Sequence, residues 1–290
     1  MDERAGQTTS RTIQSIRRVD LRVRDVERSL GFYGGVVGLE VAHRSSSHAA
    51  LRAPDGATLL TLESDGVTRP AEKEATGLFH TAIRFPTRQS LGRALGRLVA
   101  AGLEIGAGDH GVSEALYIDD PDGNGVELYW DRPRSEWPSP APGERVGMYT
   151  KAVDLQDLYE EGRGSGLVDD AAPASTDVGH VHLQVRDVDE TAAFYTNVLG
   201  LDLMAKIGSQ AAFLSSLDYH HNIGANAWNS RGSSPASEDH AGLRRVIFTT
   251  DDAEIEALKG RMAASGHAYE EDAGELVLVD PNGIELRFVT

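Results

Sequence analysis

The sequence predicts an α+β fold made of four modules, each with the order β-α-β-β-β. Three observations predict it. A segment that begins at Val19 returns in the same register 162 positions later, at Val181. Two hairpin sequences, at 120–128 and 280–286, match one another. Each hairpin follows a strand and a helix in the same order, so the repeat extends over most of the chain.

The first module begins with a strand at 19–26, where apolar and polar residues alternate. A helix is expected at 27–37, because its apolar residues have helical spacing and a glycine follows. Strands are expected at 49–52 and 58–62, on either side of a Pro-Asp-Gly turn. The third module repeats VDLRVRDV as VHLQVRDV, and FYGGVVGL as FYTNVLGL.

The second and fourth modules share a plan of strand, helix and closing hairpin. The segments are 79–85, 90–101 and 114–130 in the second module, and 245–250, 254–264 and 275–288 in the fourth. Alignment of Val-Glu-Leu with Ile-Glu-Leu places Glu285 at the position of Glu127 and Glu275 at that of Tyr117. The domain division expected is 13–133 for modules one and two and 178–290 for modules three and four. Residues 134–177 form a linker with a helical turn near 155–160.

The composition restricts the function. The chain has 290 residues and a net charge of -17, which disfavours nucleic acid and anionic membrane surfaces as partners. No cysteine is present, so any metal must be held by His, Asp or Glu. Residues 1–12 have no apolar signal region and are expected to be a disordered leader on a cytoplasmic protein.

Successive side chains of a strand point to opposite faces, and this alternation shows which candidate site residues share a face. Glu127 and Tyr129 share one face of the last hairpin strand, opposite apolar neighbours. By itself, such a glutamate is more often solvated. His180 and His182 likewise share one face of a strand, and His80 lies at the corresponding position in the second module.

Three stretches carry a resemblance to a known family: SEALYIDDPDGNGVELYWDRPRSEWP, GHVHLQVRDV, and YHHNIGANAW at 219–228. They resemble the vicinal oxygen chelate (glyoxalase/bleomycin resistance/dioxygenase) superfamily, and within it the four-module extradiol dioxygenases of catechol 2,3-dioxygenase type. The resemblance covers nearly all of 13–290. It implies that the modules form two barrel-like cavities, each enclosed by a pair of modules.

In that superfamily the metal ligands come from the first and last strands of a module. The corresponding positions here are Arg18, His80, His180 and Arg245 on the first strands, and Glu127 and Glu285 on the last. Arginine does not ligate cations. If module one pairs with two, neither cavity is complete. If module two pairs with three, His80, Glu127 and His180 form the metal site, and the arginines and Glu285 are left as an ion-pair cluster.

Two histidines and one carboxylate are the ligand set of non-heme Fe(II) oxygenases. The resemblance implies Fe(II), with Mn(II) or another divalent metal possible. It also implies catalytic roles for Tyr117, His182 and His221, with His220 a competitor for the role of His221. The other histidines, His43, His48, His110, His240 and His267, are expected to be solvated.

The expected function is therefore ring cleavage of a small, catechol-like aromatic diol by O₂. The alternatives are a non-redox metal-dependent lyase or isomerase of the same fold and a metal-free small-molecule binding protein. Free strand edges also leave a homo-oligomer possible.

Overall fold

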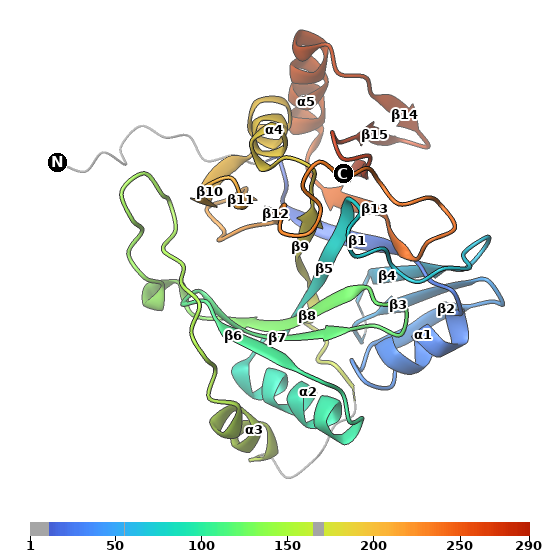
Figure 1. Cartoon of the computed structure of the whole chain (residues 1–290), viewed down its shortest axis with the longest axis vertical. Helices are drawn as coiled ribbons and strands as arrows, with labels where there is room; N and C mark the ends of the chain where they lie inside the picture. Colours follow the sequence, from blue (N-terminus) through green and yellow to red (C-terminus); the bar gives the residue numbers. More distant parts are fainter. Residues whose placement is uncertain (1–11, 55, 165–170) are drawn as a thin grey trace.

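The computed structural model describes residues 12–54, 56–164 and 171–290. The expected disordered leader lies almost entirely outside the described residues. The sixteen described strands belong to one sheet, and the helices lie outside it (Figure 1). The expected α+β class and the repeated module order are confirmed.

Each module contributes one set of elements. Module one comprises β1 (Ser15–Arg22), α1 (Val26–Tyr33), β2 (Glu40–Arg44), β3 (His48–Arg52) and β4 (Thr58–Glu63). Module two comprises β5 (Gly77–Arg84), α2 (Arg88–Ala100), β6 (Gly106–Asp109), β7 (Ser113–Asp119) and β8 (Gly125–Asp131). Module three comprises β9 (Asp177–Gln184), α4 (Val188–Ala193), the π-helical turn η2 (Phe194–Val198), β10 (Asp202–Ile207), β11 (Ala211–Ser215) and β12 (Ile223–Asn226). Module four comprises β13 (Gly242–Thr249), α5 (Asp252–Ser265), β14 (Glu270–Asp272), β15 (Glu275–Val279) and β16 (Glu285–Val289). Between modules two and three lie η1 (Arg134–Glu136) and α3 (Leu155–Arg163).

The first strand and helix differ from the expected ranges. The strand ends at Arg22 rather than at 26, because the side chain of Asp25 accepts a hydrogen bond from the backbone of Arg28 and caps α1. Asp187 caps α4 in the same way. The strand β2 lies outside the expected ranges. All five of its residues are exposed, so it has no apolar alternation by which to recognise it.

Strand pairing shows how the modules associate. β1 pairs antiparallel with β13, and β5 pairs antiparallel with β9. Module one therefore associates with four, and module two with three. In Figure 1, β5 and β9 cross the centre of the molecule beside β1 and β13.

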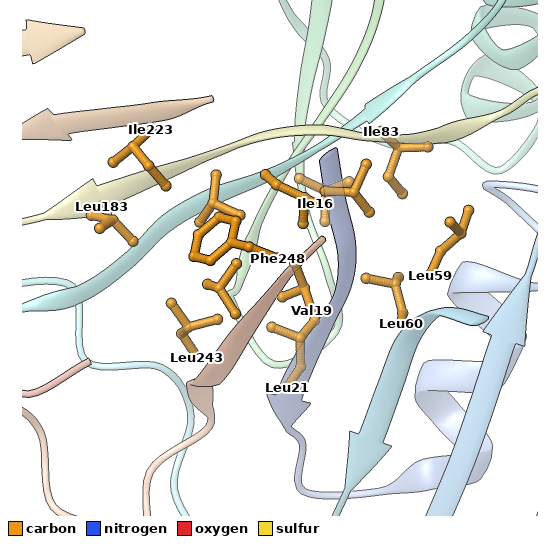
Figure 2. Close-up of a cluster of buried hydrophobic side chains, with 14 of the residues drawn as sticks. Ile16, Val19, Leu21, Leu59, Leu60, Ile83, Leu183, Ile223, Leu243 and Phe248 are labelled. Atoms are coloured by element: carbon orange, nitrogen blue, oxygen red, sulfur yellow. The ribbon is translucent and has the colours of Figure 1, made fainter. Parts of the chain in front are cut away.

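The apolar faces of these strands meet in a shared core. Figure 2 shows Val19 and Leu21 of β1 and Phe248 of β13 facing Ile83 of β5 and Leu183 of β9. All five are buried. Because side chains alternate along a strand, burying these residues turns the polar positions of β5 and β9 to the opposite side of the sheet.

Two matching turns join modules within each half of the chain. The Asp120 carboxylate accepts hydrogen bonds from the backbone of its own turn and from the Tyr33 hydroxyl of α1, at 3.0 Å. Asp280 accepts the same set, with Tyr195 as the hydroxyl donor at 3.2 Å. The tyrosine of one module therefore holds the hairpin of the next.

These turns correct the alignment of the fourth module. Because Asp280 occupies the place of Asp120, the position of Glu127 is taken by Arg287, and Glu285 takes that of Gly125. Strand pairing agrees, since Leu286 lies beside Val246 as Val126 lies beside Thr81. The same register opposes Val277 to Arg287, so Val277 rather than Glu275 takes the position of Tyr117. The two turns have equal length, since Asp119 pairs with Gly125 and Val279 with Glu285. The similar letters Ile-Glu-Leu lie two residues closer to the turn than Val-Glu-Leu, a difference that preserves the strand face and conceals the misalignment.

The segment that follows β8 extends from module two toward β10 of module three (Figure 1). The backbone N–H of Arg145 donates to the carbonyl of Met204 at 2.8 Å. Val146 is buried beside Val112 and Met204. The division into 13–133, a linker at 134–177 and 178–290 stays a prediction. Within the described ranges, no helix is long and apolar enough to cross a membrane.

We predict that Tyr33→Phe and Tyr195→Phe each lower the free energy of unfolding by about 1–2 kcal/mol, because each removes a buried hydrogen bond to an aspartate. Urea denaturation measures this change. Tyr269→Phe, at an exposed position, is the matched control and should leave stability unchanged. Equal stability of all three variants and the parent would contradict this role for the turns.

Candidate metal centre

His80, Glu127 and His180 are brought together by the pairing of modules two and three. His80 lies on β5, Glu127 on the adjacent strand β8, and His180 on β9. One ligand atom from each lies within 4.8 Å of the others. All three residues are buried, with exposed fractions of 5%, 2% and 2%.

Both histidines direct Nε2 at the same oxygen atom. Oε2 of Glu127 lies 2.8 Å from Nε2 of His80 and 3.2 Å from Nε2 of His180. The approach of His80 lacks hydrogen-bond geometry, and its Nε2 has no hydrogen-bond partner among the described residues. A buried nitrogen left without a partner is costly. The arrangement fits a cation shared by the three side chains, and their donor set suits a divalent metal.

The protonation states of Glu127 and His180 are those that metal binding requires. Burial opposes ionisation of Glu127, but His180 and His80 outweigh burial and hold its pKa well below the usual range. Burial lowers the pKa of His180 to about 4, although Glu127 acts in the opposite direction. At neutral pH the site therefore offers a carboxylate and a neutral imidazole, the forms that bind metals.

The three side chains line a cavity of about 540 Å³. Tyr117, His182 and His221 also line it. The other lining residues are Phe79, His110, Val112, Ser113, Glu144, Met148, Tyr149, Thr150, Ala205, Ile207, Phe213 and Trp228. The segment after β8 thus supplies part of the cavity wall as well as connecting modules two and three.

Tyr117 lies directly opposite Glu127 in the β7–β8 hairpin. Its hydroxyl lies 2.7 Å from Nε2 of His110, whose Nδ1 lies 3.2 Å from the carbonyl oxygen of Tyr149. Because Nδ1 faces this carbonyl, it carries the proton, and Nε2 accepts from Tyr117. Burial, followed by the charge of Glu127, raises the pKa of Tyr117. The expectation that His110 is solvated is therefore wrong.

His221 lines the cavity, and its ring lies 4.1 Å from that of His180 between centroids. Its Nδ1 lies 2.7 Å from Nδ1 of His220, whose Nε2 lies 2.8 Å from Oδ1 of Asp131. His220 is fully buried and is not among the lining residues. Because the carboxylate only accepts, His220 donates from Nε2. Burial, followed by the charges of neighbouring histidines, lowers the pKa of His221 well below the usual range. The tautomer of His221 that donates from Nδ1 to His220 leaves its Nε2 unprotonated.

Asp131 is held by several partners. Burial opposes its ionisation, but the hydrogen bond and charge of His220 and the charge of Arg84 outweigh it and lower its pKa. The Tyr219 hydroxyl also donates to Asp131, at 2.8 Å. The chain Asp131–His220–His221 therefore fixes the orientation of the histidine that faces the cavity.

His182 is buried on the same face of β9 as His180. Burial, followed by the charges of neighbouring histidines, lowers its pKa well below the usual range. Its ring lies over Gly224 of β12, where an added Cβ would come within 2.7 Å of Nδ1. The glycine therefore makes room for His182.

The corresponding region between modules one and four holds an ion-pair cluster. Nε of Arg18 lies 2.6 Å from Asp20, and Nε of Arg245 lies 3.3 Å from Glu285. Arg287 also contacts Glu285, at 2.6 Å. Neither Arg18 nor Arg245 is among the described residues that line the cavity with His180. Of the other histidines expected to be solvated, His240 is buried, with Nδ1 2.9 Å from the carbonyl oxygen of Pro70.

Comparison with known proteins identifies the class. The family model for the glyoxalase/bleomycin resistance protein/dioxygenase superfamily matches residues 15–128 and 177–288. The chain therefore belongs to this superfamily.

A particular relative extends the match over nearly the whole chain. The chain is 41% identical over 274 residues to a catechol-2,3-dioxygenase of Bacillus subtilis (strain 168), covering 93% of this chain and 95% of the relative.

Solved structures show the same fold. A putative dioxygenase from Bacillus subtilis superposes with a TM-score of 0.62 at 15% identity, covering 96% of this chain and 86% of that one. Glyoxalase I from Zea mays superposes with a TM-score of 0.57 at 18% identity, covering 95% and 92%.

We predict that His180→Ala reduces bound divalent metal from about one ion per chain to a small fraction of that, because two ligands do not complete the site. Metal analysis after anaerobic Fe(II) loading and gel filtration measures this. His267→Ala is the matched control, since His267 is exposed and away from the cavity. Unchanged metal content in His180→Ala would rule out this ligand.

We predict that the chelator-treated protein becomes less stable as the pH falls from neutral toward 4. A histidine in the unfolded chain has a pKa near 6.5, whereas burial lowers the pKa of His180 in the folded protein to about 4. Between these values the unfolded state binds more protons, so stability falls as pH falls. The expected slope is up to roughly 1.4 kcal/mol per pH unit for each such histidine.

Urea denaturation at pH 7 and 5.5 tests this dependence. The variant His182→Leu should lose less stability between the two pH values than the parent. Equal stability of the parent at both values would contradict the neutral state of the buried histidines.

Proposed function

We propose that this protein is a metal-dependent extradiol dioxygenase that cleaves a catechol-like aromatic diol with O₂. The observation that carries the proposal is the convergence of His80, Glu127 and His180 on one point of a cavity. The 41% identical catechol-2,3-dioxygenase supports the reaction class. We propose Fe(II) as the metal, with Mn(II) as the second candidate for the same ligands.

Fe(II) held by these three residues would supply a Lewis acid with free coordination positions for a diol and for O₂. The protein residues supply the proton transfers and the orientation. The unprotonated Nε2 of His221 accepts a proton from a substrate hydroxyl, and the chain to His220 and Asp131 keeps that nitrogen in the required form.

Tyr117 contributes in a different way. Because its proton is directed to His110, its oxygen presents lone pairs to a substrate hydroxyl. Its raised pKa keeps the phenol neutral, so the hydroxyl orients the diol without adding charge. His182 has an Nε2 without a hydrogen-bond partner among the described residues, and we assign it a hydrogen bond to the substrate.

Aromatic side chains complete the site. Phe79 packs against the rings of His80 and His182 with centroids 5.3 and 5.2 Å away. This apolar wall excludes water from the reacting atoms and offers a surface on which a substrate ring can stack. The cytoplasmic location and the possible homo-oligomer expected from the sequence stay predictions.

We predict that His221→Asn lowers kcat for catechol by roughly 10²–10⁴-fold, because it removes the group that accepts the proton. Bound iron should remain near the parental value, since His221 is not a ligand. An oxygen electrode, together with absorbance of the ring-cleavage product, measures the rate. The surface variant His43→Asn is the control.

The same assay separates the alternatives. Iron bound without oxygen uptake from any catechol would contradict the dioxygenase and favour a non-redox lyase or isomerase. Absence of any bound transition metal after reconstitution would favour a binding protein.

A further inference from the structure

The cavity wall away from the metal ligands is apolar and reaches the surface. Phe213 of β11 and Ile207 at the end of β10 line it together with Trp228. Ile207 is 54% exposed and Trp228 48%. Large apolar side chains that are exposed around a cavity mouth indicate a site for an apolar group.

The cavity wall away from the metal ligands carries a negative charge and no lysine or arginine among its described residues. No Lys or Arg in the described part of the chain lines the cavity, whereas Glu144 does. The neighbouring Arg145 is turned away, with its guanidinium 2.7 Å from Asp202 and 3.0 Å from Asp218. The nearby Lys151 lies over the ring of Tyr149, with Nζ 4.4 Å from its centroid. An anionic substituent would therefore meet a carboxylate, with no lysine or arginine among the described lining residues to compensate it.

The cavity is large enough to hold an aromatic ring with a substituent. A cavity of about 540 Å³ lies within the range that holds drug-sized ligands and exceeds what a bare benzene diol fills. The net charge of -17 adds a long-range field that repels anions before they reach the mouth.

We propose that the substrates are catechols with an uncharged, apolar substituent, and that Glu144 determines specificity by excluding catechols with an anionic side group. The substituent lies against Ile207, Phe213 and Trp228. This inference rests on the proposed dioxygenase function and concerns the substrate class of the same site.

Calorimetric titration of the Fe(II)-loaded protein without oxygen tests the inference independently of turnover. The probes are tert-butylcatechol, protocatechuate and the methyl ester of protocatechuate, which retains the skeleton of protocatechuate without its negative charge. The ester and tert-butylcatechol should bind at least about tenfold more tightly than protocatechuate. In Glu144→Lys the ratio of the affinity for the ester to the affinity for protocatechuate should fall about tenfold or more.

Glu136→Lys is the matched control, because it changes the net charge equally on the same segment at an exposed position outside the cavity lining. It should retain the parental ratio. Protocatechuate binding as tightly as its ester in the parent protein would overturn the inference, as would equal shifts in both lysine variants.

Different results would refute the dioxygenase function and the role of Glu144. An iron-loaded protein that consumes oxygen with catechol but prefers protocatechuate would retain the dioxygenase function and refute the role of Glu144. An iron-loaded protein inert toward every catechol would refute the dioxygenase, and the titration would still report which charge the cavity accepts.

Discussion

The antiparallel pairing of β5 with β9 is the constraint on which the site depends. In its register, Thr81 lies opposite Val181, and His80 lies opposite His182. The apolar faces of both strands enter the core, so the histidines are turned together on the other side. A slip of one residue would direct the histidines into the core and the apolar side chains into the cavity. The same ladder that stabilises the fold therefore positions His80 and His180, two proposed metal ligands that are one hundred residues apart in sequence.

The second pair of modules shows what the same geometry does with other residues. β1 and β13 pair as β5 and β9 do, but the ligand positions carry Arg18, Arg245 and Arg287. These cations are balanced by Asp20 and Glu285. One pair of modules thus places two imidazoles around a carboxylate, and the other places arginines around carboxylates. The difference between the proposed metal centre and the ion-pair cluster therefore lies in the side chains and not in the strand pairing.

Local patterns in the sequence predicted most of the individual parts. Period-two alternation placed His180 and His182 on one face, and the repeat predicted four modules. The alignment of distant segments with one another was harder to predict from the sequence. The motif Ile-Glu-Leu of the fourth hairpin matches Val-Glu-Leu by letter, but the turn held by Asp280 moves Arg287 into the ligand position. A shift of two residues leaves the alternation pattern unchanged, so the hydrogen bonds of the turn and the strand pairing are needed to reveal it.

Features that depend on long-range contacts had no local signal. His110 and Glu144 lie in segments with no regular apolar pattern, and they reach the cavity because Val146 packs against Val112 and Met204. Likewise, either His220 or His221 could face the cavity by sequence. The contact of His220 with Asp131, from the end of β8, turns His221 to the metal side.

The most direct test of the central claim is the position of the metal. Crystals of the Fe(II)-loaded protein, measured on both sides of the iron absorption edge, would give an anomalous difference map. The account predicts one strong peak per chain, within coordination distance of Nε2 of His80, Nε2 of His180 and the Glu127 carboxylate. A peak elsewhere, or beside Arg287 and Glu285, would contradict it.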